Sequence, residues 1–194
     1  MKIKLKFGLL LPLFLICIIF SERRIYTFIA LFAAALHELG HILAAKICKI
    51  ELTSLSLDLF GARIDTGMRL CSYRDEIILC LSGPLVNILF SVVAFSISHY
   101  VFENEYIVFF AAASLALGAL NLLPIKSFDG GRILTCLLDR ILNIYTSERI
   151  LTLLSFMCCF SLWCFSVYLM ITVGSSLSLF VFSVSLFSKI FIAQ

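Results

Sequence analysis

Residues 25–47 read IYTFIALFAAALHELGHILAAKI, and this stretch decides the fold. About 20 mostly apolar residues in a helix are enough to cross a bilayer, and the stretch has that length and composition. A charged side chain in the middle of such a helix costs about 2.5–3.5 kcal/mol on insertion scales. Glu38, with a histidine before it and another three positions later, therefore marks a functional position inside a membrane helix.

The composition of the whole chain is that of a membrane protein. Of its 194 residues, 62% are hydrophobic and 14% are charged, whereas a soluble domain has about 45–50% apolar and roughly 25% charged residues. The net charge is +3 and the basic residues are dispersed, so they indicate charges flanking membrane helices and no nucleic-acid partner. Most of the eight cysteines lie in apolar segments without a C-x-x-C pair, which favours neither disulfides nor a thiolate zinc site.

Apolar segments lie at residues 5–20, 25–47, 76–99, 105–123, 148–171 and 174–192. We therefore expect an all-α polytopic membrane protein with about six transmembrane helices. No small-residue cleavage site follows the first segment, so we interpret it as an uncleaved helix. With the N-terminus inside, 13 of the 15 basic residues fall on the inner side, and only Arg23 and Arg24 fall outside. The positive-inside rule then predicts a membrane protein with both termini in the cytosol.

Two segments depart from the pattern of apolar helices. Residues 54–60 alternate with period two and Gly61 follows, which predicts a small membrane-associated β-hairpin. Its exposed strand edge would accept a substrate backbone by strand addition, and an ordinary interfacial hairpin is the alternative. Asp129-Gly130-Gly131 is expected to break the chain before a short amphipathic helix over residues 132–143 at the cytosolic face.

The motif that carries chemistry is His37-Glu38-Leu39-Gly40-His41, an H-E-x-x-H sequence. Histidines four positions apart lie on one helix face, so both imidazoles can ligate one zinc ion. Glu38 lies about 60° around the helix from His41, where its carboxylate can take a proton from a water that the metal acidifies. The alternative is a polar cluster that bonds neighbouring helices. The third histidine, His99, is interpreted as an interfacial residue on the outer side.

Two histidines leave a catalytic zinc site one protein ligand short, since three protein ligands are typical. The predicted second and fourth spans both run from outside to inside, so the histidines and the segment after residue 121 share a side of the membrane. Asp129 in that segment is the predicted third metal ligand. An ordinary turn aspartate before glycine is the alternative.

At these residues the chain resembles the site-2 protease family of intramembrane metalloproteases. The family pairs H-E-x-x-H with N-x-x-P-x-x-x-x-D-G, which here runs from Asn121 to Gly130. Ser82-Gly83-Pro84-Leu85-Val86-Asn87 is similar to its small-G-P-x-x-N stretch. The layout most resembles the bacterial branch that includes the sporulation proteases, which process a sigma-factor precursor. Many members of that branch have Pro-Leu before the Asp-Gly, and here Ser127-Phe128 replaces them, which bears on the rigidity of the loop.

The resemblance implies one zinc ion per chain and a three-helix core. It also implies that the enzyme cleaves a membrane-anchored protein in or next to its transmembrane segment, and that such a cleavage can release a transcription factor. It implies that Asn121 contacts the substrate carbonyl. Asn87 would position substrate or, as the alternative, make an interhelical hydrogen bond. We expect a single domain over 1–194 with its catalytic core at about 25–143, no PDZ insertion and no C-terminal regulatory domain.

Other functions and partners stay open at this point. A catalytically silent membrane scaffold and a zinc or ion transporter are the competing functions, although the scaffold fits poorly with an intact motif. A transporter would need further acidic or histidine residues inside the other spans, and the first, fifth and sixth spans have none in their interiors. Membrane-protein inhibitors or regulators, and oligomerisation, are compatible with the sequence.

Overall fold

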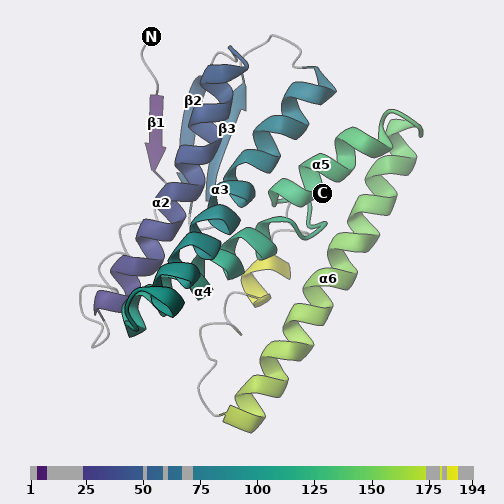
Figure 1. Cartoon of the computed structure of the whole chain (residues 1–194). Helices are drawn as coiled ribbons and strands as arrows, with labels where there is room; N and C mark the ends of the chain where they lie inside the picture. The colour runs from purple at the N-terminus through teal and green to yellow at the C-terminus, as the bar shows by residue number, and fades with distance from the viewer. Residues whose placement is uncertain are drawn as a thin grey trace. The chain divides into compact units, whose positions relative to one another are not determined.

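The structure is a computed structural model that describes residues 4–7, 24–49, 52–58, 61–66, 72–173, 180 and 183–187. The chain divides into two compact units, residues 1–120 and 121–194. The first unit holds helices α2 (Arg24–Ile47), α3 (Tyr73–Tyr100) and nearly all of α4 (Glu105–Asn121), together with three strands. The second holds α5 (Asp129–Leu138) and α6 (Ile144–Val173) (Figure 1).

Helix α3 shows the organisation of a membrane helix, with small and polar residues inside. Its buried positions recur every three or four residues and include Gly83, Asn87, Ser91 and Ser98. Its exposed positions are large and apolar, among them Leu89 and Phe95, which are 62% and 61% exposed. This arrangement is typical of helices that pack through small residues and turn their apolar side chains to lipid.

Three helices among the described residues are long and apolar enough to cross a membrane: 25–47, 73–100 and 144–172. The shorter apolar helix α4 coincides with the expected fourth span, 105–123, to within two residues. The expected first span does not begin as a helix, because residues 5–7 belong to strand β1 (Lys4–Phe7). Residues 8–20 and most of 174–192 lie outside the described residues, so a total of six spans stays a prediction.

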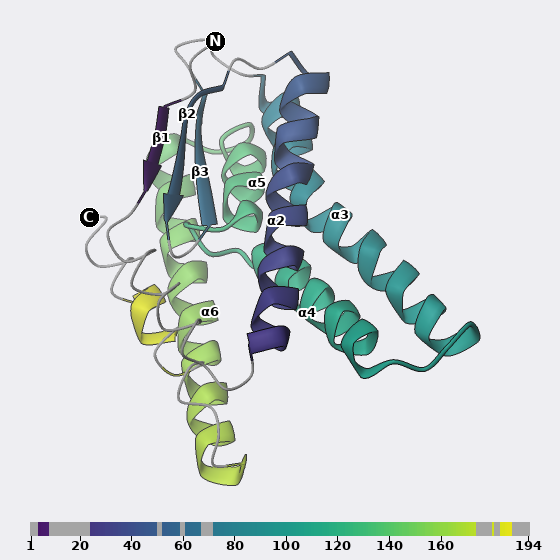
Figure 2. The ribbon, with the colours of Figure 1, turned by 90° about the vertical axis from the view of Figure 1, so that its left-hand side faces the viewer.

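Helices α2, α3 and α4 pack against one another in the first unit, and Figure 2 shows them as one group. Two aromatic pairs join α2 to α4: the rings of Tyr26 and Phe109 are 4.9 Å apart, and those of Phe32 and Phe110 are 5.8 Å apart. The Ser91 hydroxyl of α3 donates a hydrogen bond of 2.7 Å to the Ala111 carbonyl of α4. The predicted three-helix core therefore has a direct counterpart in this unit.

The contact between α2 and α3 depends on two glycines. A side-chain Cβ placed on Gly40 would lie 2.8 Å from the Ser82 carbonyl oxygen and 3.0 Å from the Gly83 Cα atom. Both of these atoms belong to the backbone of α3, which cannot move aside as a flexible side chain would. Gly40 is therefore required for the close approach of the two helices.

The strands β1, β2 (Leu52–Asp58) and β3 (Gly61–Thr66) form one sheet in the order β1-β2-β3. Strand β2 pairs parallel with β1 and antiparallel with β3, and the sheet lies beside the C-terminal half of α2 (Figures 1 and 2). The predicted strand is present, but the prediction that its edge is exposed is wrong for residues 54–57, because these have a partner strand on both sides. Among the described strands, β1 and β3 form the outer edges. The membrane association of the β2–β3 hairpin stays a prediction.

The loop before α5 is fixed within the second unit by α6. The Lys126 backbone N–H donates a hydrogen bond of 2.9 Å to the Ser155 hydroxyl. The same hydroxyl donates a hydrogen bond of 3.3 Å to the Pro124 carbonyl oxygen. Ile125 is fully buried and Phe128 is 5% exposed. This loop is therefore held by one serine of α6 and by two buried side chains.

Helix α5 begins at Asp129, three residues before the predicted start, and ends at Leu138. The prediction that Asp129-Gly130-Gly131 breaks the chain is wrong, because both glycines lie in the first turn of the helix. A Cβ on Gly130 would collide with the Leu122 carbonyl oxygen, and one on Gly131 would collide with that of Ile125. The glycines thus serve close packing of the loop on the helix.

We expect Gly40→Ala to destabilise the protein, because the added methyl group would overlap the backbone of α3. Overpacking of this kind costs about 1–3 kcal/mol, more than the gain of up to about 1 kcal/mol from helix propensity. Thermal unfolding in detergent measures the effect, and Leu39→Ala, at a neighbouring position that is 47% exposed, is the control. An unchanged midpoint for Gly40→Ala would show that the two helices do not need this close approach.

Candidate metal centre

The two histidines of the motif lie on one face of α2, as their spacing predicts. His37 is 5% and His41 is 6% exposed, and both rings are turned towards α3. Their Nε2 atoms are 3.1 Å apart and the ring planes are nearly perpendicular, at 86°. The sequence prediction that α2 brings two imidazoles together is therefore confirmed in the first unit.

The backbone of α3 sets the protonation of His41. The Nδ1 atom of His41 lies 2.8 Å from the Leu79 carbonyl oxygen, and a carbonyl can only accept, so Nδ1 carries the proton and donates it. The Ser82 hydroxyl donates to the same carbonyl at 2.6 Å. A neutral imidazole with its proton on Nδ1 has its lone pair on Nε2. His41 thus presents the lone pair of Nε2 on the side of His37.

The side chain of His37 meets a second group of α3. The Asn87 amide nitrogen lies 3.3 Å from the Nδ1 atom of His37, and Asn87 is fully buried. Its position fits the alternative of an interhelical hydrogen bond, with a candidate metal ligand as the partner. Its expected role in positioning substrate stays a prediction.

Gly83 leaves the space that the two rings occupy. A Cβ on Gly83 would lie 2.5 Å from His41 Nε2 and 2.9 Å from His37 Cε1. No side chain fits at this position without displacing the nitrogen that would bind the metal. The glycine of the Ser82-Gly83-Pro84 stretch therefore has a steric reason for being there.

The geometry of the pair fits zinc. Zn–N bonds of about 2.0–2.1 Å at tetrahedral angles place two ligand nitrogens about 3.3 Å apart, and the observed separation of the Nε2 atoms is 3.1 Å. At that distance, two lone pairs facing each other repel unless a cation or a proton lies between them. Two buried imidazoles with this spacing are therefore suited to a shared divalent metal.

The other predicted site residues lie on three helices. Glu38 is half-buried and directly follows His37 in α2. Asn121 is the last residue of α4, and Asp129 is the first of α5 in the second unit; both are half-buried. What the sequence analysis missed is the role of Leu79, because a backbone carbonyl has no sequence signature. The serine and glycine that follow at 82 and 83 had been noted only as part of a family motif.

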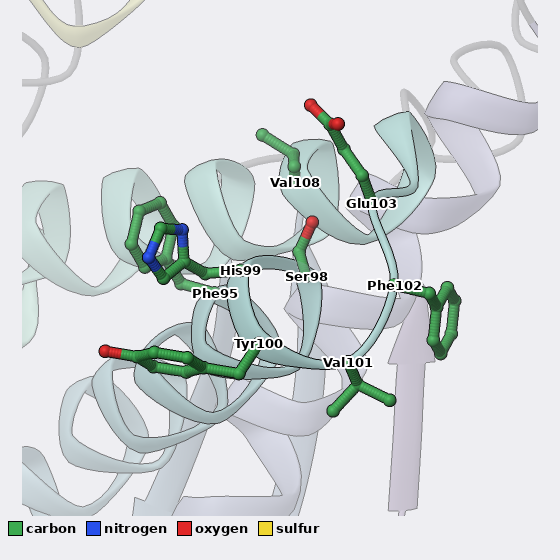
Figure 3. Close-up of a pocket in the computed structure, with 8 residues that line it drawn as sticks. All are labelled: Phe95, Ser98, His99, Tyr100, Val101, Phe102, Glu103 and Val108. Atoms are coloured by element: carbon green, nitrogen blue, oxygen red, sulfur yellow. The ribbon is translucent and has the colours of Figure 1, made fainter.

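His99 lies apart from this pair, at the C-terminal end of α3. Its ring is exposed, stacks on Phe95 at 6.4 Å and meets Tyr100 edge-on at 4.7 Å. With Ser98 and Glu103, these residues line an open pocket of about 440 Å³ where α3 turns into α4 (Figure 3). His99 is thus an exposed residue at a helix end, as its interpretation as an interfacial residue requires.

Comparison with known proteins identifies the family. Residues 26–107 and 103–165 match peptidase family M50, and together these ranges contain the histidine pair, Asn87 and the second motif. The chain belongs to this family. This match confirms the resemblance that the three motifs indicate.

Relatives of this M50 chain include two curated proteins. A zinc metalloprotease of Methanocaldococcus jannaschii is 31% identical over 130 residues, which are 63% of this chain and 37% of the relative. Stage IV sporulation protein FB of Bacillus subtilis is 28% identical over 159 residues, which are 79% of this chain and 54% of the relative. The chain therefore spans about a third to a half of the length of these relatives.

A solved structure shares the fold of the M50 chain. The site-2 protease from Methanocaldococcus jannaschii matches with a TM-score of 0.72 at 22% identity, over 98% of this chain and 90% of that one. The fold predicted from the motifs, a helical membrane protein of the site-2 protease type, is in this respect confirmed.

We expect Gly83→Ala to remove zinc from the M50 chain while leaving it folded. The methyl group would occupy the space beside His41 Nε2, so the two rings could no longer face each other. Zinc content by atomic absorption should fall well below one ion per chain, with helicity unchanged by circular dichroism.

The matched control is Gly118→Ala in α4. There the nearest atoms to a Cβ are the Pro84 carbonyl oxygen at 3.1 Å and Asn87 Cβ at 3.4 Å, contacts that small shifts relieve. A Gly83→Ala protein with full zinc content would contradict the assignment of the metal to these two rings.

Proposed function

We propose that the chain is a zinc-dependent intramembrane endopeptidase. The observation that carries the proposal is the buried pair His37 and His41, whose Nε2 atoms are 3.1 Å apart within a helix apolar enough to cross a membrane. Membership of peptidase family M50 and the name of the archaeal relative support the metal and the reaction class.

In this proposal Asp129 is the third protein ligand. Its support comes from its place in the second motif, which runs from Asn121 to Gly130 and lies within the residues that match family M50. Two imidazoles and one carboxylate make a donor set used in catalytic zinc sites, with the fourth position open.

Glu38 acts as the general base. It adjoins His37 in the sequence and points about 60° away from His41 around the helix, so it can face the same site without being a ligand. Zinc, when bound, acidifies water and polarises the scissile carbonyl. The Glu38 carboxylate then accepts the proton from the attacking water and passes it to the leaving amine.

The proposed substrate is a membrane-anchored protein that is cleaved within or beside its transmembrane segment. A peptide bond in a helix is hydrogen-bonded internally, so the substrate must unwind locally before hydrolysis, and its freed backbone groups then need partners. We assign Asn121 to the carbonyl next to the scissile bond. Because β2 has strands on both sides, an added substrate strand would pair with the outer edge of β3 or β1.

The biological setting that we propose is regulated intramembrane proteolysis, with release or activation of a transcription factor. The match to a sporulation protein supports a role in sporulation. The distribution of Lys and Arg supports an active site and both termini on the cytosolic side of the membrane.

We expect Glu38→Gln to abolish cleavage and to leave zinc bound. The amide has the size of the carboxylate but cannot accept a proton at neutral pH, and the loss of a general base costs roughly 10²–10⁴-fold in rate. The measurements are product on a gel, after co-expression with single-span candidate substrates, and zinc content.

Glu105→Gln, the same change at an exposed position in the first turn of α4, is the control. If Glu38→Gln cleaves at the wild-type rate, the general base has been misassigned. If the wild type holds zinc yet cleaves no candidate substrate, the result favours a transporter or a scaffold over a protease.

We expect Asp129→Ala to lower the zinc affinity as well as the activity. Loss of a residue that only orients a ligand weakens metal binding about 10–100-fold, and loss of a direct ligand should weaken it at least as much. Competition with a chelator measures the affinity. Asp139→Ala, at the other end of α5, is the control, and an unchanged affinity in Asp129→Ala would place the third ligand elsewhere.

A further inference from the structure

The fully buried side chain of Asn87 lies against His37, with its amide nitrogen 3.3 Å from the Nδ1 atom of that ring. Gly118 of α4 packs on this residue, since a Cβ on Gly118 would lie 3.4 Å from Asn87 Cβ. Burial of an amide costs free energy unless its polar atoms find hydrogen-bond partners. Burial of this amide beside the His37 ring therefore costs free energy, which indicates a role for Asn87 other than filling space.

The orientation of the amide follows from what His37 must do. With the amide nitrogen towards Nδ1, His37 would accept there and carry its own proton on Nε2, the atom that faces His41. In that orientation Oδ1 is buried with no hydrogen-bond partner in the described part of the chain, and a half-turn would put the amide nitrogen in the same place, so only the demand of His37 chooses between the two. A ligand nitrogen needs its lone pair free, so a metal on Nε2 requires the proton on Nδ1.

A half-turn of the amide resolves this conflict. It exchanges two atoms of similar size, and the hydrogen-bond partner decides between the two orientations. After the turn, Oδ1 accepts the Nδ1–H proton of His37. The bond then has the same sense as the one from His41 Nδ1–H to the Leu79 carbonyl, at 2.8 Å.

We propose that Asn87 is a positioning residue that holds His37 with its proton on Nδ1 and its Nε2 lone pair towards the metal. The inference rests on the proposed zinc binding by His37. Helix α3 would then orient both histidines from one face, through the Leu79 carbonyl on one side of Gly83 and the Asn87 amide on the other. Metal-bound histidines commonly donate their second N–H to an oxygen in this way, which raises their basicity and fixes the ring.

A purely structural role predicts different behaviour. If Asn87 only fills space between α2, α3 and α4, a side chain of similar size should replace it. If it acts as an acceptor, an oxygen at this position is what matters. Asn87→Leu keeps the approximate volume without an acceptor, and Asn87→Asp keeps the oxygens without a donor.

Ser91→Ala is the matched control for loss of a buried hydrogen bond. Ser91 lies one turn further along the buried face of α3, and its hydroxyl donates to the Ala111 carbonyl at 2.7 Å, a hydrogen bond that joins α3 to α4 and involves no histidine. A general weakening of the helix packing would therefore affect this variant too.

The experiment measures the affinity of the purified full chain for zinc, by competition with a chelator in detergent. We expect Asn87→Leu to bind zinc about 10–100-fold more weakly than the wild type, with Asn87→Asp and Ser91→Ala close to the wild type. Wild-type affinity in Asn87→Leu, or equal weakness in Asn87→Leu and Asn87→Asp, would overturn the inference. A wild type that binds no zinc would instead refute the proposed function.

A second measurement does not depend on the folding of any Asn87 variant. The chain has three histidines, and His99→Gln leaves only the two of the metal pair for ¹⁵N NMR of the zinc-loaded protein. We expect His37 to show a protonated, hydrogen-bonded Nδ1 and a metal-bound Nε2. An unprotonated Nδ1 in the zinc-loaded chain would overturn the role of Asn87 even if every variant folded poorly.

Discussion

The close approach of α2 to α3 is the constraint on which the candidate metal centre depends. Gly40 brings the helix backbones within contact, and Gly83 leaves room for the two imidazole rings between them. A larger residue at either position would separate the helices or displace the ring nitrogens. The hydrogen bond from His41 to the Leu79 carbonyl forms only because the helices lie this close. The helix packing and the candidate metal centre thus depend on the same two glycines.

A membrane setting explains why polar groups are distributed as they are. Lipid offers no hydrogen bonds, so polar side chains of the spans turn inward and find partners on other helices or on their own backbone. Ser91 bonds across to α4, whereas Ser96 on the exposed face bonds back to the Val92 carbonyl of its own helix at 2.8 Å. In such surroundings, the fully buried Asn87 of α3 is notable because its amide lies beside His37 of α2, 3.3 Å from Nδ1.

In the second unit, a non-helical loop fixes the position of the acidic residue Asp129 at the start of α5. Ser155 of α6 holds the loop at Pro124 and Lys126, and the paired glycines let the first turn of α5 lie on the loop carbonyls. Asp129 therefore starts a helix whose position within its unit is set by backbone contacts. A rigid mounting of this kind suits a residue proposed to ligate a metal, because ligand geometry tolerates little displacement.

The sequence by itself determined the apolar helix over residues 25–47, the pairing of His37 with His41, and the family, because helical periodicity and motif spacing are local properties. It also predicted a strand at residues 54–60, which overlaps β2 at 54–58, but the pairing of β1 along one side of that strand appears only in the tertiary structure. Likewise, Gly130 and Gly131 predict a break in the chain from sequence, because glycine is common in turns. In the structure they lie in the first turn of α5, where the absence of a side chain permits close packing on the loop. The Leu79 carbonyl and the contact of Asn87 with His37 were decided by the tertiary structure alone. Every residue has a carbonyl, and which one faces a ring depends on how two helices cross, which no single helix encodes.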